Sequence, residues 1–175
     1  GEWGYSTWHH GGRPFSAEVQ GAYLARELLT NLAEEIPLSI WYDWANDGPD
    51  PKETEHNFGT VHNNYTVKPA YQAARTIAIT LDGYRFLRRV PLERADDYLL
   101  LFAKQEKTAC AMWTTGIEHT VILPISTYEV AGVGMTGDPY PIESEGEGLA
   151  VSLTPSPRYL LFGADQAPAY LGGWR

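Results

Sequence analysis

The sequence predicts two parts with different architectures: an α/β part over residues 1–83 and an antiparallel β-sandwich over residues 84–175. The first part shows helix, buried strand, long loop and helix in turn, a pattern typical of a parallel sheet. The second part has short strand-like runs separated by Gly and Pro turns, which is typical of a sandwich. The pattern changes near Asp82 and Gly83, so the predicted domain boundary lies there.

Two amphipathic helices are expected in the first part. The first covers residues 16–33, where Ser16 suits the N-cap and Glu18 suits the positive end of the helix dipole. The second begins at Pro69, a residue favoured in a first helical turn, and runs to about residue 81. The expected apolar face of the first helix consists of Val19, Ala22, Tyr23, Leu29 and Leu32.

The segment between the two helices has two halves of opposite character. Residues 36–42 (IPLSIWY) are almost wholly apolar, as a strand buried on both faces would be. Residues 43–59 form a polar loop that is rich in Asp, Asn, Gly and Pro. In the second part, strands are expected at residues 86–92, 98–104, 108–114, 119–124, 128–135, 149–154 and 159–162, with a hairpin joining the second to the third.

The composition argues against several classes of function. A net charge of −9 without basic clusters disfavours a nucleic-acid partner and an anionic membrane surface. No apolar stretch is long enough to span a bilayer. Cys110 is the lone cysteine, which excludes an internal disulfide framework, and no Cys/His cluster has zinc spacing. We expect no cofactor and no metal, because the tandem His9-His10 has no third ligand spaced nearby.

A first candidate cluster surrounds Glu2, which is followed by Trp3, Tyr5, Trp8 and His9. Pyranose rings stack on aromatic planes while carboxyl groups act on the glycosidic bond, so this combination suits a sugar site. The alternative is a solvated glutamate at a chain terminus.

A second candidate cluster is Trp41, Tyr42, Trp44 and Asp47, at the carboxyl end of the expected strand 36–42. Ligand sites of parallel α/β sheets lie at that end. For Trp41 and Trp44 the alternative is packing in the core. Glu55 begins a third cluster, where the loop returns toward the second helix; it could bind sugar hydroxyls or brace the loop, and we favour bracing.

Four segments carry a family resemblance in their order and spacing. They are GEWGYS at residues 1–6, IWYDWANDG at 40–48, EHNFGTV at 55–61 and KPAY at 68–71. They resemble the end of the seventh strand, the eighth strand with its loop, and the last helix of clan A glycoside hydrolases. These are (β/α)8 retaining enzymes with cellulase-like and xylosidase-like members. Residues 148–159 (GLAVSLTPSPRY) resemble the closing strands of the β-sandwich beside such barrels.

The resemblance implies a role for each candidate residue. Glu2 would be the nucleophile, and Trp41 would be the platform for the sugar next to the cleaved bond. The substrate would be a β-linked oligo- or polysaccharide. Further substrate contacts would come from Tyr5, Trp8, His9, Tyr42, Trp44, Asp47 and Glu55.

The chain also departs from the family. Barrel strands one to six have no counterpart, and neither does the Asn-Glu pair that carries the general acid/base, since no Asn-Glu dipeptide occurs. Retaining hydrolysis needs two carboxyl groups about 5–5.5 Å apart. We therefore expect a C-terminal piece of such an enzyme, inactive alone, whose partner is the N-terminal part of the barrel. The alternative is a carbohydrate-binding or barrel-supporting sandwich without catalysis.

Overall fold

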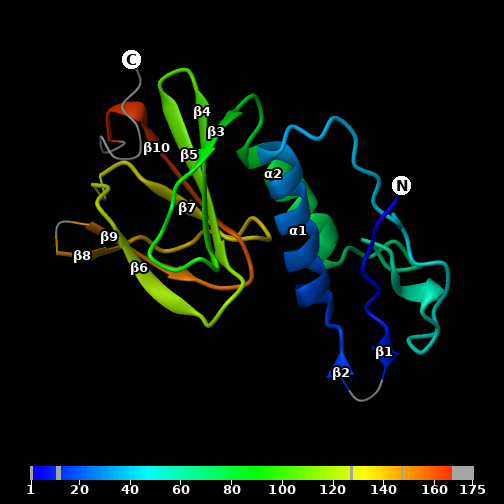
Figure 1. Ribbon diagram of the computed structural model, residues 1–175. Helices are drawn as coiled ribbons and strands as arrows, with labels where there is room; N and C mark the ends of the chain where they lie inside the picture. The colour runs from blue at the N-terminus through cyan, green and yellow to red at the C-terminus, as the bar shows by residue number, and fades with distance from the viewer. Residues whose placement is uncertain (1, 11–12, 127, 147, 167–175) are drawn as a thin grey trace. The chain divides into compact units, whose positions relative to one another are not determined.

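The structure, a computed structural model, describes residues 2–10, 13–126, 128–146 and 148–166 (Figure 1). The chain divides into two compact units, Gly1–Ala78 (unit 1) and Ile79–Arg175 (unit 2). Helices dominate unit 1 and antiparallel sheets dominate unit 2, in the order that the sequence predicts. The elements of the first 80 residues are β1 (His9–His10), β2 (Arg13–Pro14), α1 (Ala17–Ala33), the 3₁₀ helix η1 (Glu55–Asn57) and α2 (Pro69–Thr80).

Helix α1 begins where the sequence predicts. Ser16 is its N-cap, and the Ser16 hydroxyl oxygen accepts a hydrogen bond from the Val19 amide at 3.2 Å. This bond satisfies one of the amides that the first helical turn leaves free. The predicted apolar face is only partly right, because Val19, Tyr23 and Leu32 are exposed. The helix is apolar on more than one side, and the buried side is centred on Ala22, Leu24, Ala25 and Leu29 instead.

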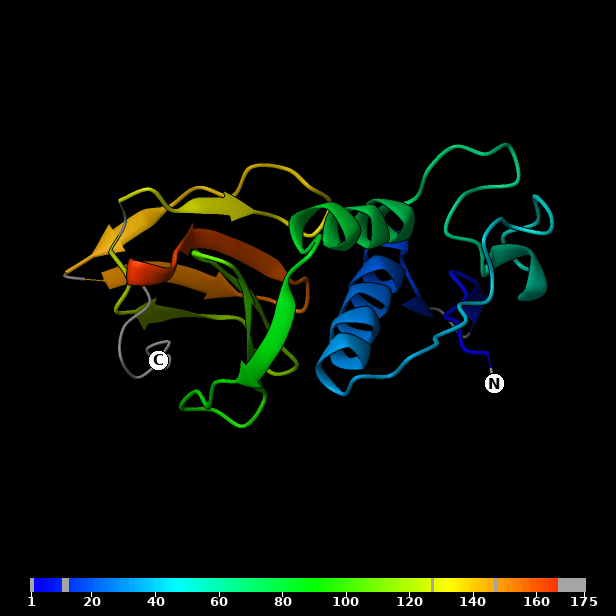
Figure 2. The ribbon, with the colours of Figure 1, turned by 90° about the horizontal axis from the view of Figure 1, so that it is seen from above.

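Helix α2 begins at Pro69 as predicted and ends at Thr80, one residue before the predicted end. Its buried side chains are small or β-branched, and they include Ala70, Ala73 and Ile77. The two helices lie side by side in both views of the ribbon (Figures 1 and 2). Within the described parts of the chain, neither helix has the length and apolar character that crossing a membrane requires.

Residues 36–42 do not form the buried strand that their apolar sequence predicts. Their one regular pairing is an isolated parallel bridge between Trp3 and Trp41. The side chains of Ile36, Leu38 and Ile40 are 50%, 73% and 48% exposed. A strand is buried on both faces only when neighbouring strands and covering layers surround it. Within the described part of unit 1, the segment at Trp3 supplies a single parallel neighbour.

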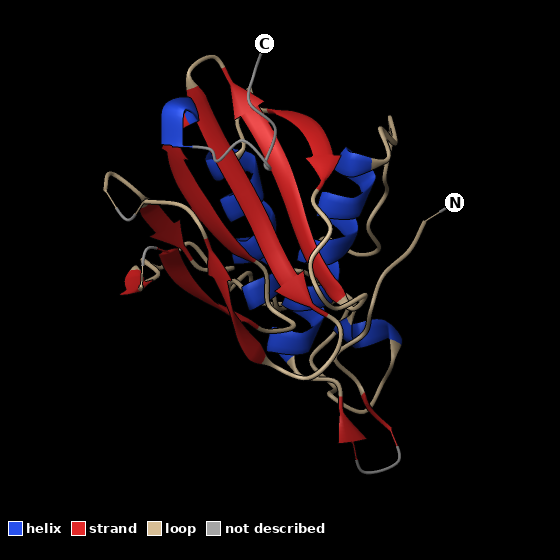
Figure 3. Cartoon of the chain, turned by 60° about the vertical axis from the view of Figure 1, so that its left-hand side comes forward, coloured by secondary structure: helices blue, strands red, loops and turns tan. Residues whose placement is uncertain are grey.

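Unit 2 consists of two antiparallel sheets, whose strands are red in Figure 3. The five-stranded sheet has the order β3-β4-β5-β10-β7, and the three-stranded sheet has the order β6-β9-β8. Each predicted run overlaps one of these strands, whereas β8 was not predicted because its Glu-Ser-Glu sequence is wholly polar. The strands are β3 (Arg85–Arg89), β4 (Asp97–Lys104), β5 (Lys107–Thr114), β6 (His119–Leu123), β7 (Ala131–Val133), β8 (Glu143–Glu145), β9 (Gly148–Leu153) and β10 (Arg158–Gly163).

The two sheets of unit 2 share one hydrophobic core. Leu99, Met112 and Leu160 contribute from the five-stranded sheet, and Leu149 contributes from the three-stranded sheet. Cys110 lies in the same core, where burial raises the pKa of its thiol to about 12. The thiol therefore stays protonated at neutral pH and packs as a small apolar side chain.

Two adjacent residues of β6 test this core. Leu123 is 3% exposed and belongs to the core, whereas Ile122 is 46% exposed. Leu123→Ala should lower the free energy of unfolding by about 2–5 kcal/mol, because it removes buried methyl groups and leaves a cavity. Ile122→Ala should change it by less than about 1 kcal/mol. Urea unfolding followed by circular dichroism measures both, and equal losses would contradict the assigned register of β6.

Candidate functional site

The start of the chain pairs with the end of the apolar segment in unit 1. The Trp3 amide donates to the Ile40 carbonyl at 3.1 Å, and the Tyr42 amide donates to the Trp3 carbonyl at 2.8 Å. These bonds make the parallel bridge between Trp3 and Trp41. Side chains alternate along extended backbone, so Trp3 and Trp41 share one face while Glu2 and Tyr42 are assigned to the other.

The face with Trp3 and Trp41 is an aromatic cluster. The Trp41 ring lies 4.8 Å from Trp3, nearly perpendicular to it, and 6.0 Å from Tyr5. Tyr5 also packs 4.6 Å from Tyr23 of α1 and 5.9 Å from Phe15. The indole N–H of Trp41 is buried and has no hydrogen-bond partner among the described residues. Trp41 as a whole is half-buried, and the role that the sequence predicts for it stays a prediction.

The opposite face carries Tyr42 with two carboxylates. The Tyr42 hydroxyl lies 3.4 Å from Asp47 Oδ2 and 3.3 Å from Glu55 Oε2, and it can donate its one proton to either carboxylate. Loss of hydration raises the pKa of Tyr42, and the negative charges of Asp47 and Glu55 raise it further. Tyr42 therefore stays a neutral hydrogen-bond donor at physiological pH. Glu2, Asp47 and Glu55 are exposed, so their carboxylates are accessible to a hydroxyl-rich ligand.

The remaining predicted residues lie elsewhere in unit 1. The exposed ring of Trp44 lies 5.7 Å from the exposed ring of Tyr65, and the two form a separate pair. Trp8 is half-buried, and its amide donates to Ser6 Oγ at 3.2 Å. His9 lies in β1, but its side chain is outside the described part of the structure. Six of the predicted residues thus fall into three groups: Tyr5 and Trp41 in the aromatic cluster, Tyr42 with Asp47 and Glu55, and Trp44 with Tyr65.

Buried polar side chains that the sequence analysis missed hold these loops in place. Gln20 of α1 is fully buried, and its Nε2 donates to the Tyr5 carbonyl at 2.7 Å and the Phe58 carbonyl at 3.0 Å. Asn57 is also buried, and its Nδ2 donates to the Asp50 carbonyl at 2.8 Å. A glutamine among the apolar residues of the first helix was the one available sequence signal, since helix interiors rarely bury an amide without a partner.

Lys68, directly before α2, is the most deeply buried charged group of unit 1, at 1% exposed. Its Nζ donates to Asn46 Oδ1 at 2.8 Å, to the Asn57 carbonyl at 3.3 Å and to Thr7 Oγ1 at 3.5 Å. No carboxylate of the residues that the structure describes lies within ion-pair distance of it. Burial lowers the pKa of Lys68 to about 8.

The chain is similar to solved structures, although its sequence matches no family model. No family model matches the chain, and no curated protein matches it. A solved family 39 glycoside hydrolase from the gut symbiont Bacteroides cellulosilyticus WH2 is similar with a TM-score of 0.77 and 28% sequence identity. The similarity covers 90% of this chain and 32% of that protein, so the chain spans about a third of its length.

Two family 30 structures share the fold at lower identity. The endoxylanase from Clostridium papyrosolvens C71 has a TM-score of 0.61 at 10% identity, over 93% of this chain and 40% of that one. Xylanase C from Talaromyces cellulolyticus has a TM-score of 0.55 at 14% identity, over 92% of this chain and 38% of that one. The resemblance to glycoside hydrolases that the sequence predicts is therefore confirmed at the level of structure.

The lowered pKa of Lys68 should make the stability of the folded chain depend on pH. Its pKa is about 8 in the folded chain and ordinarily 10.5, so between these values the unfolded chain binds more protons. Stability should therefore rise with pH across this window, by up to about 1.4 kcal/mol per pH unit from this residue. Nuclear magnetic resonance of ¹³C-labelled lysine should show one side chain titrating near pH 8. Lys68→Arg, which stays charged, should lack both the resonance and the slope; an unchanged slope would contradict the assignment.

Proposed function

We propose that this chain is the C-terminal portion of a retaining glycoside hydrolase that acts on β-linked saccharides. The observation that carries the proposal is the parallel pairing of Trp3 with Trp41, with helix α1 between them in the chain. Parallel neighbours connected through a helix are the repeating unit of a (β/α)8 barrel. The similarity to the family 39 glycoside hydrolase, at 28% identity, supports the same origin.

Residues 1–83 would be the last βα units of the barrel, and residues 84–175 would be a β-sandwich accessory domain. The exposed side chains of Ile36, Leu38 and Ile40 support this assignment. A strand from the rest of the barrel would pair beside them and cover them. The N-terminal part of the barrel, which would carry the general acid/base, would therefore be the partner of this chain.

In this proposal Glu2 is the nucleophile. Its carboxylate attacks the anomeric carbon and forms a covalent glycosyl-enzyme, while the acid/base of the missing part protonates the leaving oxygen. Tyr42, Asp47 and Glu55 would hydrogen-bond sugar hydroxyls, because they gather on the face assigned to Glu2. Water would then release the sugar, with the acid/base taking up its proton.

The aromatic contact to the sugar has several candidates. The sequence favours Trp41, but the contacts of Trp41 with Trp3 and Tyr5 support a packing role for all three. The exposed ring of Trp44 has an accessible face and suits stacking better. Trp8 and His9 stay candidate contacts.

A second candidate function is sugar binding by unit 2 alone. Such a module needs an exposed row of planar aromatic side chains. Trp113 and Tyr159 are buried, Tyr98 stacks on Trp113 at 4.7 Å, and Tyr128 is exposed. This arrangement favours a supporting role for unit 2. Saturable binding of soluble xylan by the full chain, kept in Glu2→Gln and lost in Tyr128→Ala, would favour the module instead.

The isolated 175-residue chain should hydrolyse aryl β-glycosides at no measurable rate. Glu2 supplies one carboxylate, and the retaining mechanism requires a second carboxyl group as the acid/base. Release of nitrophenol from aryl β-xyloside and β-glucoside measures the rate. Turnover by the chain alone that disappears in Glu2→Gln would contradict the incomplete-barrel proposal.

The complete enzyme tests the role of Glu2. A 2-deoxy-2-fluoro β-glycoside with a good leaving group should become attached to the Glu2 carboxylate, as peptide mass spectrometry would show. Glu2→Gln should lower kcat by about 10⁴-fold or more, whereas Glu53→Gln, at an exposed loop position, should leave it unchanged. A label on another carboxylate would refute the role of Glu2. A complete protein that cleaves no β-linked saccharide would refute the function.

A further inference from the structure

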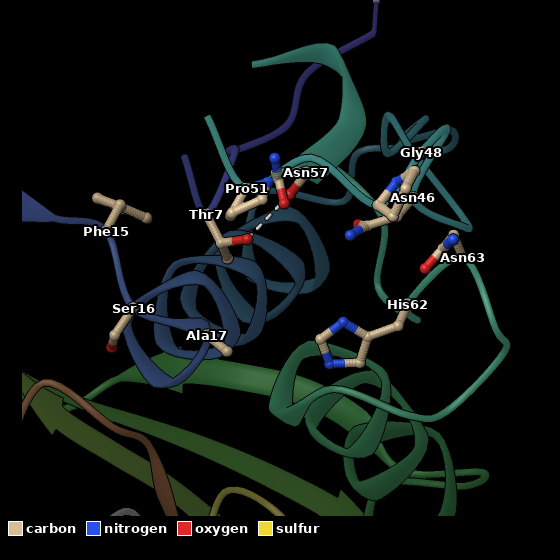
Figure 4. Close-up of a pocket in the computed structure, with 11 residues that line it drawn as sticks. Thr7, Phe15, Ser16, Ala17, Asn46, Gly48, Pro51, Asn57, His62 and Asn63 are labelled. Carbon is tan, nitrogen blue, oxygen red and sulfur yellow. Dashed lines mark hydrogen bonds between the residues drawn. The ribbon is translucent and has the colours of Figure 1, made fainter. Parts of the chain in front are cut away.

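A second hollow in unit 1 is distinct from the face assigned to Glu2. It has a volume of about 480 Å³, and Glu2, Tyr42, Asp47 and Glu55 are not among the described residues that line it. Figure 4 shows Thr7 and Asn57 on one side of this pocket and Asn46 and Asn63 on another, with His62 below them and the start of α1 beside Thr7. Most of the lining surface is apolar, and the polar side chains of Asn46, His62 and Asn63 project from loops at one part of it.

One buried cation lies behind the pocket, in a chain that is acidic as a whole. The net charge of the chain is −9, yet no Asp or Glu is among the described residues of the lining. Lys68 lies directly behind the lining, because its Nζ donates to Thr7, Asn46 and Asn57. All three acceptors are neutral, so the buried ammonium has hydrogen bonds but no compensating charge. A buried ion without a counter-charge is costly, and a nearby anion lowers that cost.

The charge of Lys68 acts on the pocket wall. Loss of hydration lowers the pKa of His62, and the positive charge of Lys68 lowers it further. Lys68 is the one charged group that contributes to this shift. An anion in the pocket would oppose both effects and would raise the pKa of His62.

The lining also leaves hydrogen-bond donors for a ligand. Asn46 accepts from Lys68 through Oδ1, which leaves its Nδ2 group to donate. His62 and Asn63 add an imidazole N–H and a side-chain amide at the same pocket.

We propose that this pocket binds an oxyanion, such as a carboxylate, sulfate or phosphate group, through the donors of Asn46, His62 and Asn63. Lys68 supplies the attractive charge from behind the lining. A neutral sugar would use the same donors, but it would gain nothing from the buried ammonium. The oxyanion could belong to an acidic sugar or to a free inorganic ion, and the experiment distinguishes these two sources.

Imidazole resonances of the full chain provide the readout. The chain is titrated with acid in sodium sulfate and in sodium chloride at the same ionic strength, and then in sodium glucuronate. The pKa of His62 should be higher in sulfate than in chloride, while the other histidine resonances should respond equally to both salts. Binding at pH values where His62 is protonated should saturate with a Kd of about 1 mM, as expected for a small ion.

Two neighbouring asparagines provide a matched pair of variants. Asn63 and Asn64 are both exposed, but Asn63 lines the pocket and Asn64 does not. Asn64 Oδ1 accepts from the Thr66 amide and hydroxyl, a role that aspartate keeps. Both Asn63→Asp and Asn64→Asp add one negative charge. Asn63→Asp should weaken sulfate binding by about tenfold or more, and Asn64→Asp should weaken it much less.

Each outcome decides the proposal. Tighter binding of glucuronate than of sulfate supports the proposal and identifies an acidic sugar as the ligand. Tighter binding of sulfate than of glucuronate supports the proposal and identifies a free ion as the ligand. Identical titration of His62 in all three salts would overturn it. Equal weakening by the two variants would also overturn it, because net charge would then explain the effect. A response to neutral xylo-oligosaccharides without a response to sulfate would replace it with a neutral sugar site. No outcome depends on the activity of Glu2.

Discussion

The buried ammonium of Lys68 is the interaction on which the geometry of unit 1 depends. Its partners are Thr7 in the first segment and Asn46 and Asn57 in the loop 43–59, up to 61 residues from it in sequence. An apolar side chain there would leave Asn46 Oδ1 without the donor that Lys68 supplies. The buried side chain of Gln20 likewise donates hydrogen bonds to the Tyr5 and Phe58 carbonyls and so joins two segments. The loops are therefore positioned by polar contacts, while the helices beneath them are packed by apolar ones.

Close approach of the backbone links these loops to the candidate catalytic face. A Cβ atom on Gly4 would lie 1.7 Å from the Tyr42 carbonyl oxygen, and one on Gly59 would lie 2.1 Å from the Asn46 amide nitrogen. Any other residue at either position would push the segments apart. The two glycines thus allow the Glu2 segment and the Tyr42 loop to lie against each other. The aromatic cluster behind them then fixes which face each side chain occupies.

Local signals in the sequence predicted the local structure well. The hydroxyl of Ser16, the fixed backbone angle of Pro69 and the alternation within residues 98–114 each act over a few residues, and α1, α2 and the β4–β5 hairpin form as expected. The prediction of a buried strand at residues 36–42 was wrong. Apolar content shows what a segment prefers to contact, but it does not show whether the neighbouring strands are present. The burial of Lys68 could not be predicted either, since it depends on partners from two other segments of the chain.

The exposed apolar edge at Ile36, Leu38 and Ile40 has a thermodynamic consequence. These side chains keep about half or more of their surface in water in the folded chain, so they contribute less to the heat capacity of unfolding than buried side chains of the same size. A strand that covered them would bury this surface on association, and the association would have a negative heat-capacity change. Because the hydrophobic contribution to binding weakens on cooling, the affinity between the chain and such a partner would fall at low temperature.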